Sequence, residues 1–124
     1  MREIKFRGRD EHGEWHYGAF MGVSYDGVVA PIEYANIYDD GMASRVFPDT
    51  VGQFTGLTDK DGNAIYEGDI VAWDDGTPPT SVRWDEHFAY YVIMESLILG
   101  HACKSIRVVG NVYDNPDLLE VAHD

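Results

Sequence analysis

Cysteine, long apolar runs and basic residues are all scarce in this sequence. Cys103 is its one cysteine, so no internal disulfide can form, and such sparing use is typical of a reducing cytoplasm. No apolar run approaches the roughly 20 residues that a membrane helix needs. The first six residues alternate charged and apolar side chains and lack the apolar stretch of a signal peptide. These absences predict a cytoplasmic protein that neither crosses a membrane nor depends on disulfides.

Only nine lysines and arginines stand against 22 acidic residues, which gives a net charge of −13. Four of the basic residues lie among the first nine positions with Glu3 as the one acid. That stretch therefore carries +3 and the rest of the chain −16. A body of that charge repels phosphate backbones, because nucleic-acid affinity depends on Lys and Arg displacing counterions. Two interpretations stay open: a solvated acidic surface without a specific partner, or an acidic face that meets a basic partner.

The composition is that of one compact domain, since 44% of the 124 residues are hydrophobic and 13% are aromatic. Turn signals rich in Asp and Gly recur at 10–13, 39–41, 59–63 and 74–76, because these residues favour turn conformations. Between them, short runs alternate apolar and polar residues, which is the period of a β-strand. The pattern predicts a mainly β fold, a small barrel or a sandwich, with little helix.

The first expected element is a β-hairpin over residues 4–19, folded around the turn at Gly13. Further strands are expected at 28–32, 70–73, 81–84, 88–94 and 106–113, with a β segment at 46–54 that is broken around Pro48. Short helices are expected within 95–103 and 115–119. The stretch 33–45 has no readable period, and a mobile loop is expected there.

No catalytic or metal-binding constellation stands out. Residues 59–63 (DKDGN) look briefly like a calcium loop, but glycine is fourth rather than sixth and position twelve is Ile70. A hairpin turn is the better interpretation. His101 and Cys103 are too few ligands for zinc, the serines form no nucleophile elbow, and no carboxylate pair can be argued among so many. We therefore expect no enzyme activity and no cofactor.

Aromatic side chains gather in the second half of the chain. Trp73 and Trp84 lie on expected strands that a Pro-Pro turn separates, and Tyr90 and Tyr91 follow soon after. Such residues either fill the core of a small barrel or line a groove for a partner. Both faces of the strand at 88–94 are apolar, so it is either central in its sheet or covered by a second chain. A homo-oligomer is one expected outcome.

Three sequence blocks, taken together in their order and spacing, carry a family resemblance. They read REIKFRG followed by GEWHYG (2–8 and 13–18), DTVGQFTGLTDKDGNAIYEGDIV (49–71) and VGNVYDNPDLL (109–119). In these blocks the chain resembles the YopX family of small proteins encoded by bacteriophages and prophages. The similarity extends from end to end, and the segment 21–47 is the most individual part.

The resemblance implies a mainly β protein containing a small SH3-like barrel, with an N-terminal β-hairpin and a phage or prophage origin. It implies a single domain over 1–124, with the barrel at about 50–124 and a variable insertion or loop at 21–47. It brings no known reaction and no catalytic residues. The positions expected to support the fold are Gly56, Glu67, Gly68, Asp69, Gly110 and Asn111. The three glycines stand next to strand ends, where the backbone needs positive φ or close approach.

The functional hypothesis from sequence is a non-catalytic binding protein that engages a host or phage protein. The candidate contact residues are Trp73, Trp84, Tyr90, Tyr91, Arg7 and Arg9. The alternative is a nucleic-acid-binding barrel that uses the basic N-terminal strand. The charge of the remaining chain opposes that alternative, and four phosphate contacts would give a salt slope of only about −4.

Overall fold

The computed structural model describes residues 4–86, 90–94 and 97–120. It is 53% strand and 12% helix, with antiparallel sheets, which confirms the mainly β class. The chain divides into two compact units, Met1–Phe54 and Thr55–Asp124. The predicted single domain stays a prediction.

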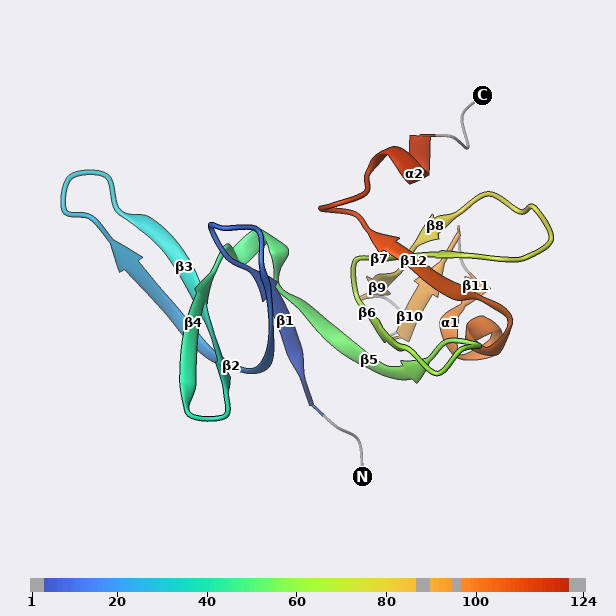
Figure 1. Cartoon of the computed structure of the whole chain (residues 1–124), viewed down its shortest axis with the longest axis horizontal. Helices are drawn as coiled ribbons and strands as arrows, with labels where there is room; N and C mark the ends of the chain where they lie inside the picture. The colour runs from blue at the N-terminus through green and yellow to red at the C-terminus, as the bar shows by residue number, and fades with distance from the viewer. Residues whose placement is uncertain (1–3, 87–89, 95–96, 121–124) are drawn as a thin grey trace. The chain divides into compact units, whose positions relative to one another are not determined.

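The first unit is an antiparallel sheet with the strand order β4-β3-β2-β1-β5 (Figure 1). Its elements are β1 (Phe6–Arg9), β2 (Trp15–Asp26), β3 (Ile32–Asp39), β4 (Met42–Val46), the 3-10 turn η1 (Pro48–Thr50) and β5 (Gly52–Thr58). The expected opening hairpin is confirmed, since Phe6 pairs with Gly18 and Arg9 with Trp15. Strand β5 begins in the first unit and continues into the second.

Two of the expectations for this unit are wrong. Residues 33–45, expected to be a loop, form most of β3 and β4. Their hairpin turn at Asp40 and Gly41 has φ values of 47° and 85°, the positive φ pair that suits the twist of a two-residue hairpin. Residues 28–32, expected to be a strand, instead connect β2 to β3, and only Ile32 belongs to a strand.

The second unit holds two three-stranded sheets, β12-β7-β8 and β11-β10-β9, while β6 lies beside β5. Its elements are β6 (Ala64–Tyr66), β7 (Asp69–Ala72), β8 (Thr80–Ser81), β9 (Arg83–Asp85), β10 (Tyr90–Ile93), β11 (Leu97–Ile98), α1 (Leu99–Ala102), η2 (Cys103–Ser105), β12 (Arg107–Asn111) and α2 (Asp117–Glu120). Strands β8 and β9 are separated only by Val82, so one run of chain passes from the first sheet to the second. Within the described residues the hydrogen-bonded strands do not close into a barrel.

Each unit has its own hydrophobic core. The core of the second unit contains Ile65, Val71, Val82, Tyr91, Ile93, Leu99, Ala102, Cys103 and Ile106. The core of the first is much smaller: Ala35, Ile37 and Val46, with Phe6 and Val51 packed against them. In the described part of the chain, no helix has the length and apolar character needed to cross a membrane.

Candidate functional site

The first unit carries a two-stranded projection that we call the arm, residues 21–34. Strand β2 pairs with β1 only as far as Gly18, and β4 pairs with β3 only from Ala35 onward. Between those limits β2 and β3 pair with each other alone, and Figure 1 shows the hairpin continuing beyond β1 and β4. Isolated two-stranded ribbons are marginally stable in water, so the arm depends on its base.

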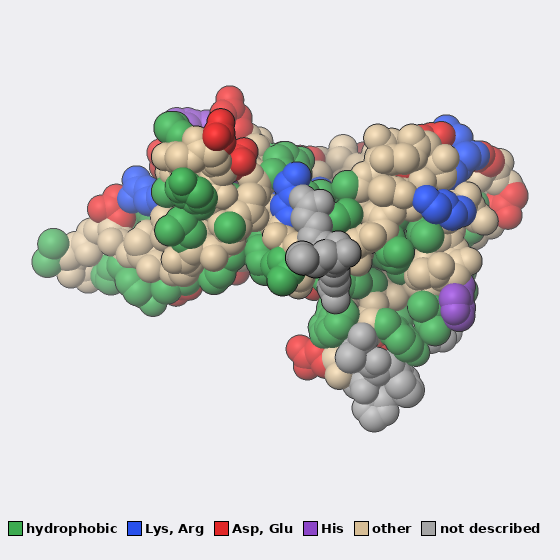
Figure 2. All heavy atoms as spheres, turned by 90° about the horizontal axis from the view of Figure 1, so that it is seen from below, with side chains coloured by type: hydrophobic (Ala, Val, Ile, Leu, Met, Phe, Trp, Pro, Cys, Tyr) green, Lys and Arg blue, Asp and Glu red, His purple; other side chains and the backbone are tan. Residues whose placement is uncertain are grey.

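The arm is apolar and exposed. Of its 14 residues only Asp26 and Glu33 are charged. Its exposed hydrophobic residues, with their exposed fractions, are Met21 61%, Val23 52%, Tyr25 63%, Val28 98%, Val29 98% and Ile32 54%. Figure 2 shows hydrophobic side chains at the end of the projection. Exposed apolar surface of this kind marks interaction sites on soluble proteins.

One face of the arm continues the core of its unit outward. Phe20 lies opposite Ile37 and Val23 lies opposite Ala35, and residues directly opposite in a sheet share a face. Ile37 and Ala35 are core residues, so Phe20, Val23 and then Tyr25 form a stripe on the core face. Their exposed fractions rise from 44% to 52% and 63% with distance from the core. The core face therefore extends past the residues that can cover it.

The base of the arm is fixed by Arg45 and Asn36. Arg45 Nη1 donates to Asp26 Oδ2 at 3.3 Å, and its guanidinium lies 4.5 Å from the centre of the Tyr34 ring. Asn36 Nδ2 donates to the Gly22 carbonyl and to Ser24 Oγ, both at 3.3 Å. These contacts hold the ribbon in place without covering the stripe.

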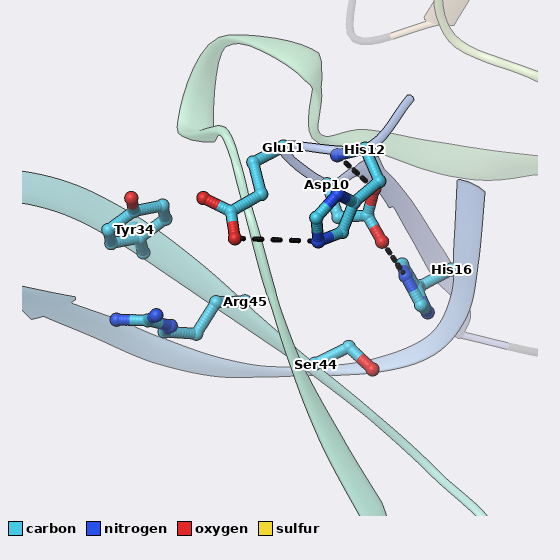
Figure 3. Close-up of a pocket in the computed structure, with 7 residues that line it drawn as sticks. All are labelled: Asp10, Glu11, His12, His16, Tyr34, Ser44 and Arg45. Carbon is cyan, nitrogen blue, oxygen red and sulfur yellow. Dashed lines mark hydrogen bonds and ion pairs between the residues drawn. The ribbon is translucent and has the colours of Figure 1, made fainter. Parts of the chain in front are cut away.

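A second feature is a hollow of about 230 Å³ beside the β1–β2 turn. Its lining residues are Asp10, Glu11, His12, His16, Tyr34, Ser44 and Arg45. In Figure 3 the Asp10 carboxylate points at His16, and the oxygen Oδ2 lies 2.7 Å from His16 Nε2. The hydrogen bond with His16 and the N–H groups of Glu14 and His12 lower the pKa of Asp10 to about 2.

Asp10, Glu14 and His16 are the residues here that could hold a metal ion, because their ligand atoms lie within 4.8 Å of one another. Both oxygens of Asp10 already have partners, however. Oδ1 accepts the N–H groups of His12 and Glu14 at 2.8 and 2.9 Å, and Oδ2 contacts His16. A cation would compete with the interactions that form the turn.

The turn that begins at Asp59 has the same geometry as the turn at Asp10, and the comparison indicates the structural role of the Asp10 carboxylate. Asp59 Oδ1 accepts the N–H groups of Asp61 and Asn63, both at 2.9 Å. In both turns the glycine N–H donates to the aspartate carbonyl at 3.1 Å, and Gly13 and Gly62 have φ values of 84° and 85°. Residues 59–63 are thus the expected hairpin turn. We infer that the Asp10 carboxylate also serves mainly to form its turn.

The aromatic residues singled out from sequence do not gather into one groove. Tyr91 is a core residue, and Trp73 packs against the same core. Trp84, 40% exposed, meets Tyr91 edge-on with ring centres 4.8 Å apart, and Tyr90 is half-buried. Strand β10 is the middle strand of its sheet, which explains its two apolar faces; residues 88–89 of the predicted strand lie outside the described residues.

Arg7 and Arg9 do not form an exposed basic stripe. Arg7 is only 6% exposed, and its guanidinium lies 4.8 Å from the centre of the Trp15 ring. Arg9 is half-buried, and its backbone N–H donates to Thr50 Oγ1 at 2.9 Å. Arg7 therefore contributes to the packing of the first unit, and its placement is a correction to its proposed role as a contact residue.

The residues expected to support the fold occupy turns and strand ends. Gly56 and Gly68 have φ values of 84° and 91°, and a Cβ on Gly110 would lie 2.5 Å from Asn115 Oδ1. Asp69 Oδ2 accepts the Tyr66 N–H at 2.7 Å across the turn that contains the half-buried Glu67. Asn111 Oδ1 accepts the N–H groups of Tyr113 and Asp114, at 3.0 and 2.9 Å.

Sequence reasoning missed the arm as a site. It set residues 21–47 apart as a variable segment and took the two adjacent valines, Val28 and Val29, for part of a strand. A signal was present, because Gly27 and Pro31 bracket three apolar residues. Gly and Pro mark turns, so an apolar turn with no polar residue was the feature to notice.

Comparison with known proteins identifies the family. The family described as YopX protein matches residues 5–120. The crystal structure of protein EF1440 from Enterococcus faecalis is similar in fold, with a TM-score of 0.54 and 20% sequence identity; the match covers 96% of this chain and 99% of that one. No curated protein matches the chain. With nearly its whole length matched, the chain belongs to the YopX family.

Proposed function

We propose that this protein is a non-catalytic protein-binding module, an accessory factor of phage or prophage origin, and that its arm is the binding surface. The observation that carries the proposal is the exposure of six large hydrophobic residues within 14 positions of the arm. Burying one such side chain is worth about 1.5–3 kcal/mol, so covering several gives enough free energy for specific binding. Membership of the YopX family supports the phage origin.

The charge of the chain supports the choice of partner class. A protein with a net charge of −13 attracts basic surfaces and repels acidic ones. This charge mainly changes the rate at which a partner associates. The arm itself is nearly neutral, because Asp26 pairs with Arg45. We therefore expect apolar contact through the arm and electrostatic steering by the rest of the chain, with the partner a host or phage protein in the bacterial cytoplasm.

The hollow beside Asp10 supports a non-catalytic role for this protein. A general base needs a carboxylate that is free to accept a proton from substrate, whereas both oxygens of Asp10 are hydrogen-bonded. The low pKa of about 2 also makes this carboxylate a weak base. The hollow is thus better explained as the space around a turn.

The test is a pull-down from bacterial lysate at low and moderate salt with the parent and a Val28→Ser, Val29→Ser variant. Both valines are 98% exposed, so the changes leave the fold intact. A matched control is Val109→Ser, an exposed valine of the second unit. We expect parent and control to retain a protein that the arm variant loses. Equal capture by all three, or capture by none at either salt, would reject the arm as a binding surface.

A further inference from the structure

We propose that the arm binds a segment of its partner that places an arginine, flanked by apolar side chains, against Tyr25 and Glu33. The inference rests on the proposed function, because it names the chemistry that the arm recognises in the partner. It starts from the two faces of the arm, which differ in how their charged groups are paired.

The two charged residues of the arm lie on opposite faces of the ribbon. Asp26 pairs with Ile32 on the face turned away from the stripe, and Tyr34 is on that face two positions after Ile32. The other face carries the stripe, and there Tyr25 lies directly opposite Glu33. Residues in such a pair share a face, with Cβ atoms about 4.5–5.5 Å apart. Glu33 is therefore the one charged residue of the arm on the stripe face.

On the face turned away from the stripe, an arginine contacts both a tyrosine and a carboxylate. The Arg45 guanidinium lies 4.5 Å from the centre of the Tyr34 ring (Figure 3). Its Nη1 donates to Asp26 Oδ2 at 3.3 Å. A guanidinium suits both neighbours, because its flat cation stacks on an aromatic ring while its N–H groups bond a carboxylate. The charge on this face is thus compensated within the chain.

The stripe face presents the same two kinds of group without a cation. Tyr25 is 63% exposed, and Glu33 is exposed as well. Among the residues that the structure describes, no lysine or arginine pairs with Glu33 or lies over the Tyr25 ring. A carboxylate beside an exposed aromatic ring suits a cation that has an apolar stem. The missing partner of this pair is therefore a basic side chain.

The neighbours of this pair on the stripe are apolar. Val23 lies two positions before Tyr25, and the stripe continues inward to Phe20. The ring centre of Phe20 lies 5.9 Å from that of Phe6, which ties the inner end of the stripe to its unit. A wholly apolar segment laid over the stripe would strip water from Glu33 and give nothing in return. A segment with apolar side chains and one cation satisfies both parts of the surface.

Arginine suits this site better than lysine. A guanidinium is planar and offers adjacent N–H groups to a carboxylate, whereas an ammonium is a strongly hydrated point charge. The chain already uses arginine for this purpose, where Arg45 contacts Tyr34 and Asp26. The net charge of −13 favours the approach of a basic segment. Rising salt should weaken the contact, because it screens the attraction.

The first experiment titrates the isotope-labelled protein with a capped peptide of the sequence leucine-valine-arginine-valine-leucine and follows the amide signals by NMR. The matched peptide has citrulline in place of arginine, which keeps the shape of the side chain and removes its charge. We expect saturable shifts around Tyr25 and Glu33, and binding of the citrulline peptide about three- to tenfold weaker. Equal binding of the two peptides, no saturable binding, or shifts confined to other parts of the chain would overturn the inference.

The second experiment repeats the titration with Glu33→Gln and, as its control, Asp39→Asn. Both positions are exposed acids on the same face of β3, because an even number of positions separates them. Each substitution removes one negative charge. We expect Glu33→Gln to weaken the arginine peptide about three- to tenfold and to remove its advantage over the citrulline peptide. Asp39→Asn should do neither, and equal weakening by the two variants, or none by Glu33→Gln, would reject the contact.

Failure of this inference differs from failure of the proposed function. If the lysate experiment finds an arm-dependent protein but the arginine and citrulline peptides bind alike, the proposed function stands and the arginine contact is rejected. If the Val28→Ser, Val29→Ser variant changes nothing in the lysate and the arginine peptide does not bind, both are rejected.

Discussion

Asp59 and Val108, which are 49 positions apart in the sequence, are joined by a hydrogen bond from the Val108 N–H to Asp59 Oδ2 at 2.9 Å. The bond ties the turn after β5 to strand β12. Burial of Asp59 opposes its ionisation, yet three backbone N–H donors, of Val108, Asn63 and Asp61, together hold its pKa below the usual value. The equivalent oxygen of Asp10 instead contacts the side chain of His16. One turn is thus locked into the second unit, and the other lies at the surface of the first.

The different surroundings of Asp59 and Asp10 predict that replacement by alanine lowers the free energy of unfolding by different amounts at the two positions. Asp59 is 1% exposed, so Asp59→Ala removes a buried acceptor from three partly buried N–H groups and should lower the free energy of unfolding by about 2–3 kcal/mol. Asp10→Ala should cost clearly less, because water can replace the carboxylate there. Urea denaturation of both variants beside the parent measures the difference. Equal losses would show that burial does not separate the two turns.

Asp10 should also make stability depend on pH in acid. Its pKa falls from 3.8 in the unfolded chain to about 2 in the fold, so its contribution is complete above about pH 4 and is lost as the pH falls toward 2. Asp10→Asn removes the charge. The melting temperature of the variant should lie below that of the parent at pH 6, and the gap should close between about pH 4 and pH 2. A gap that does not change with pH would contradict this role of the charge.

Gly68 should tolerate no β-branched residue. Its φ of 91° lies in the left-handed region, where a β-branched side chain is strained. Gly68→Val should therefore cost more than about 1 kcal/mol. Asp75→Asn is the comparison, because an amide oxygen can still accept the Thr77 N–H that Asp75 Oδ1 accepts at 2.9 Å. Thermal melts should show a clear loss for the first variant and little for the second.

Gly18 is required for a different reason, the close approach of two strands. A Cβ there would overlap the carbonyl oxygen of Tyr38 and lie 2.9 Å from its carbonyl carbon. Since the obstacle is backbone, Gly18→Ala should cost at least about 1–3 kcal/mol or prevent folding. The matched control is Gly100→Ala in α1, where nothing lies within 4 Å and helix propensity favours alanine. Circular dichroism melts compare them, and a stable Gly18→Ala protein would refute the close approach.

Duplex DNA should not bind to the N-terminal strand. Arg7 is buried against Trp15, so the strand presents fewer basic side chains to phosphates than its sequence contains. The acidic remainder of the chain repels phosphates. A mobility-shift assay at about 50 mM salt should show no complex. If a complex does form and Arg9→Ala weakens it, the nucleic-acid alternative regains support.

Local backbone chemistry was the predictable part of this fold. Gly13 and Gly68 could be placed in turns because aspartate within a few residues of glycine favours a turn whatever the surroundings. The strands β3 and β4 could not be predicted in the same way. Ala35 and Ile37 are buried because the long strand β2 and Val46 lie beside them, and no local pattern reveals that pairing. The same limit applies to Trp84 and Tyr91, whose different exposures depend on their places in a sheet.

Val82, the one residue between β8 and β9, has a consequence for how the second unit unfolds. The Val82 N–H donates to the carbonyl of Asp69, the first residue of β7, and the Val82 carbonyl accepts the N–H of Gly68, the residue before it. The chain then enters the sheet of β10. Neither sheet can lose its strand in this segment, β8 or β9, without disturbing the other sheet. Hydrogen exchange of the amides on β7 and β10 should therefore report one common opening free energy, that of a single cooperative unfolding event.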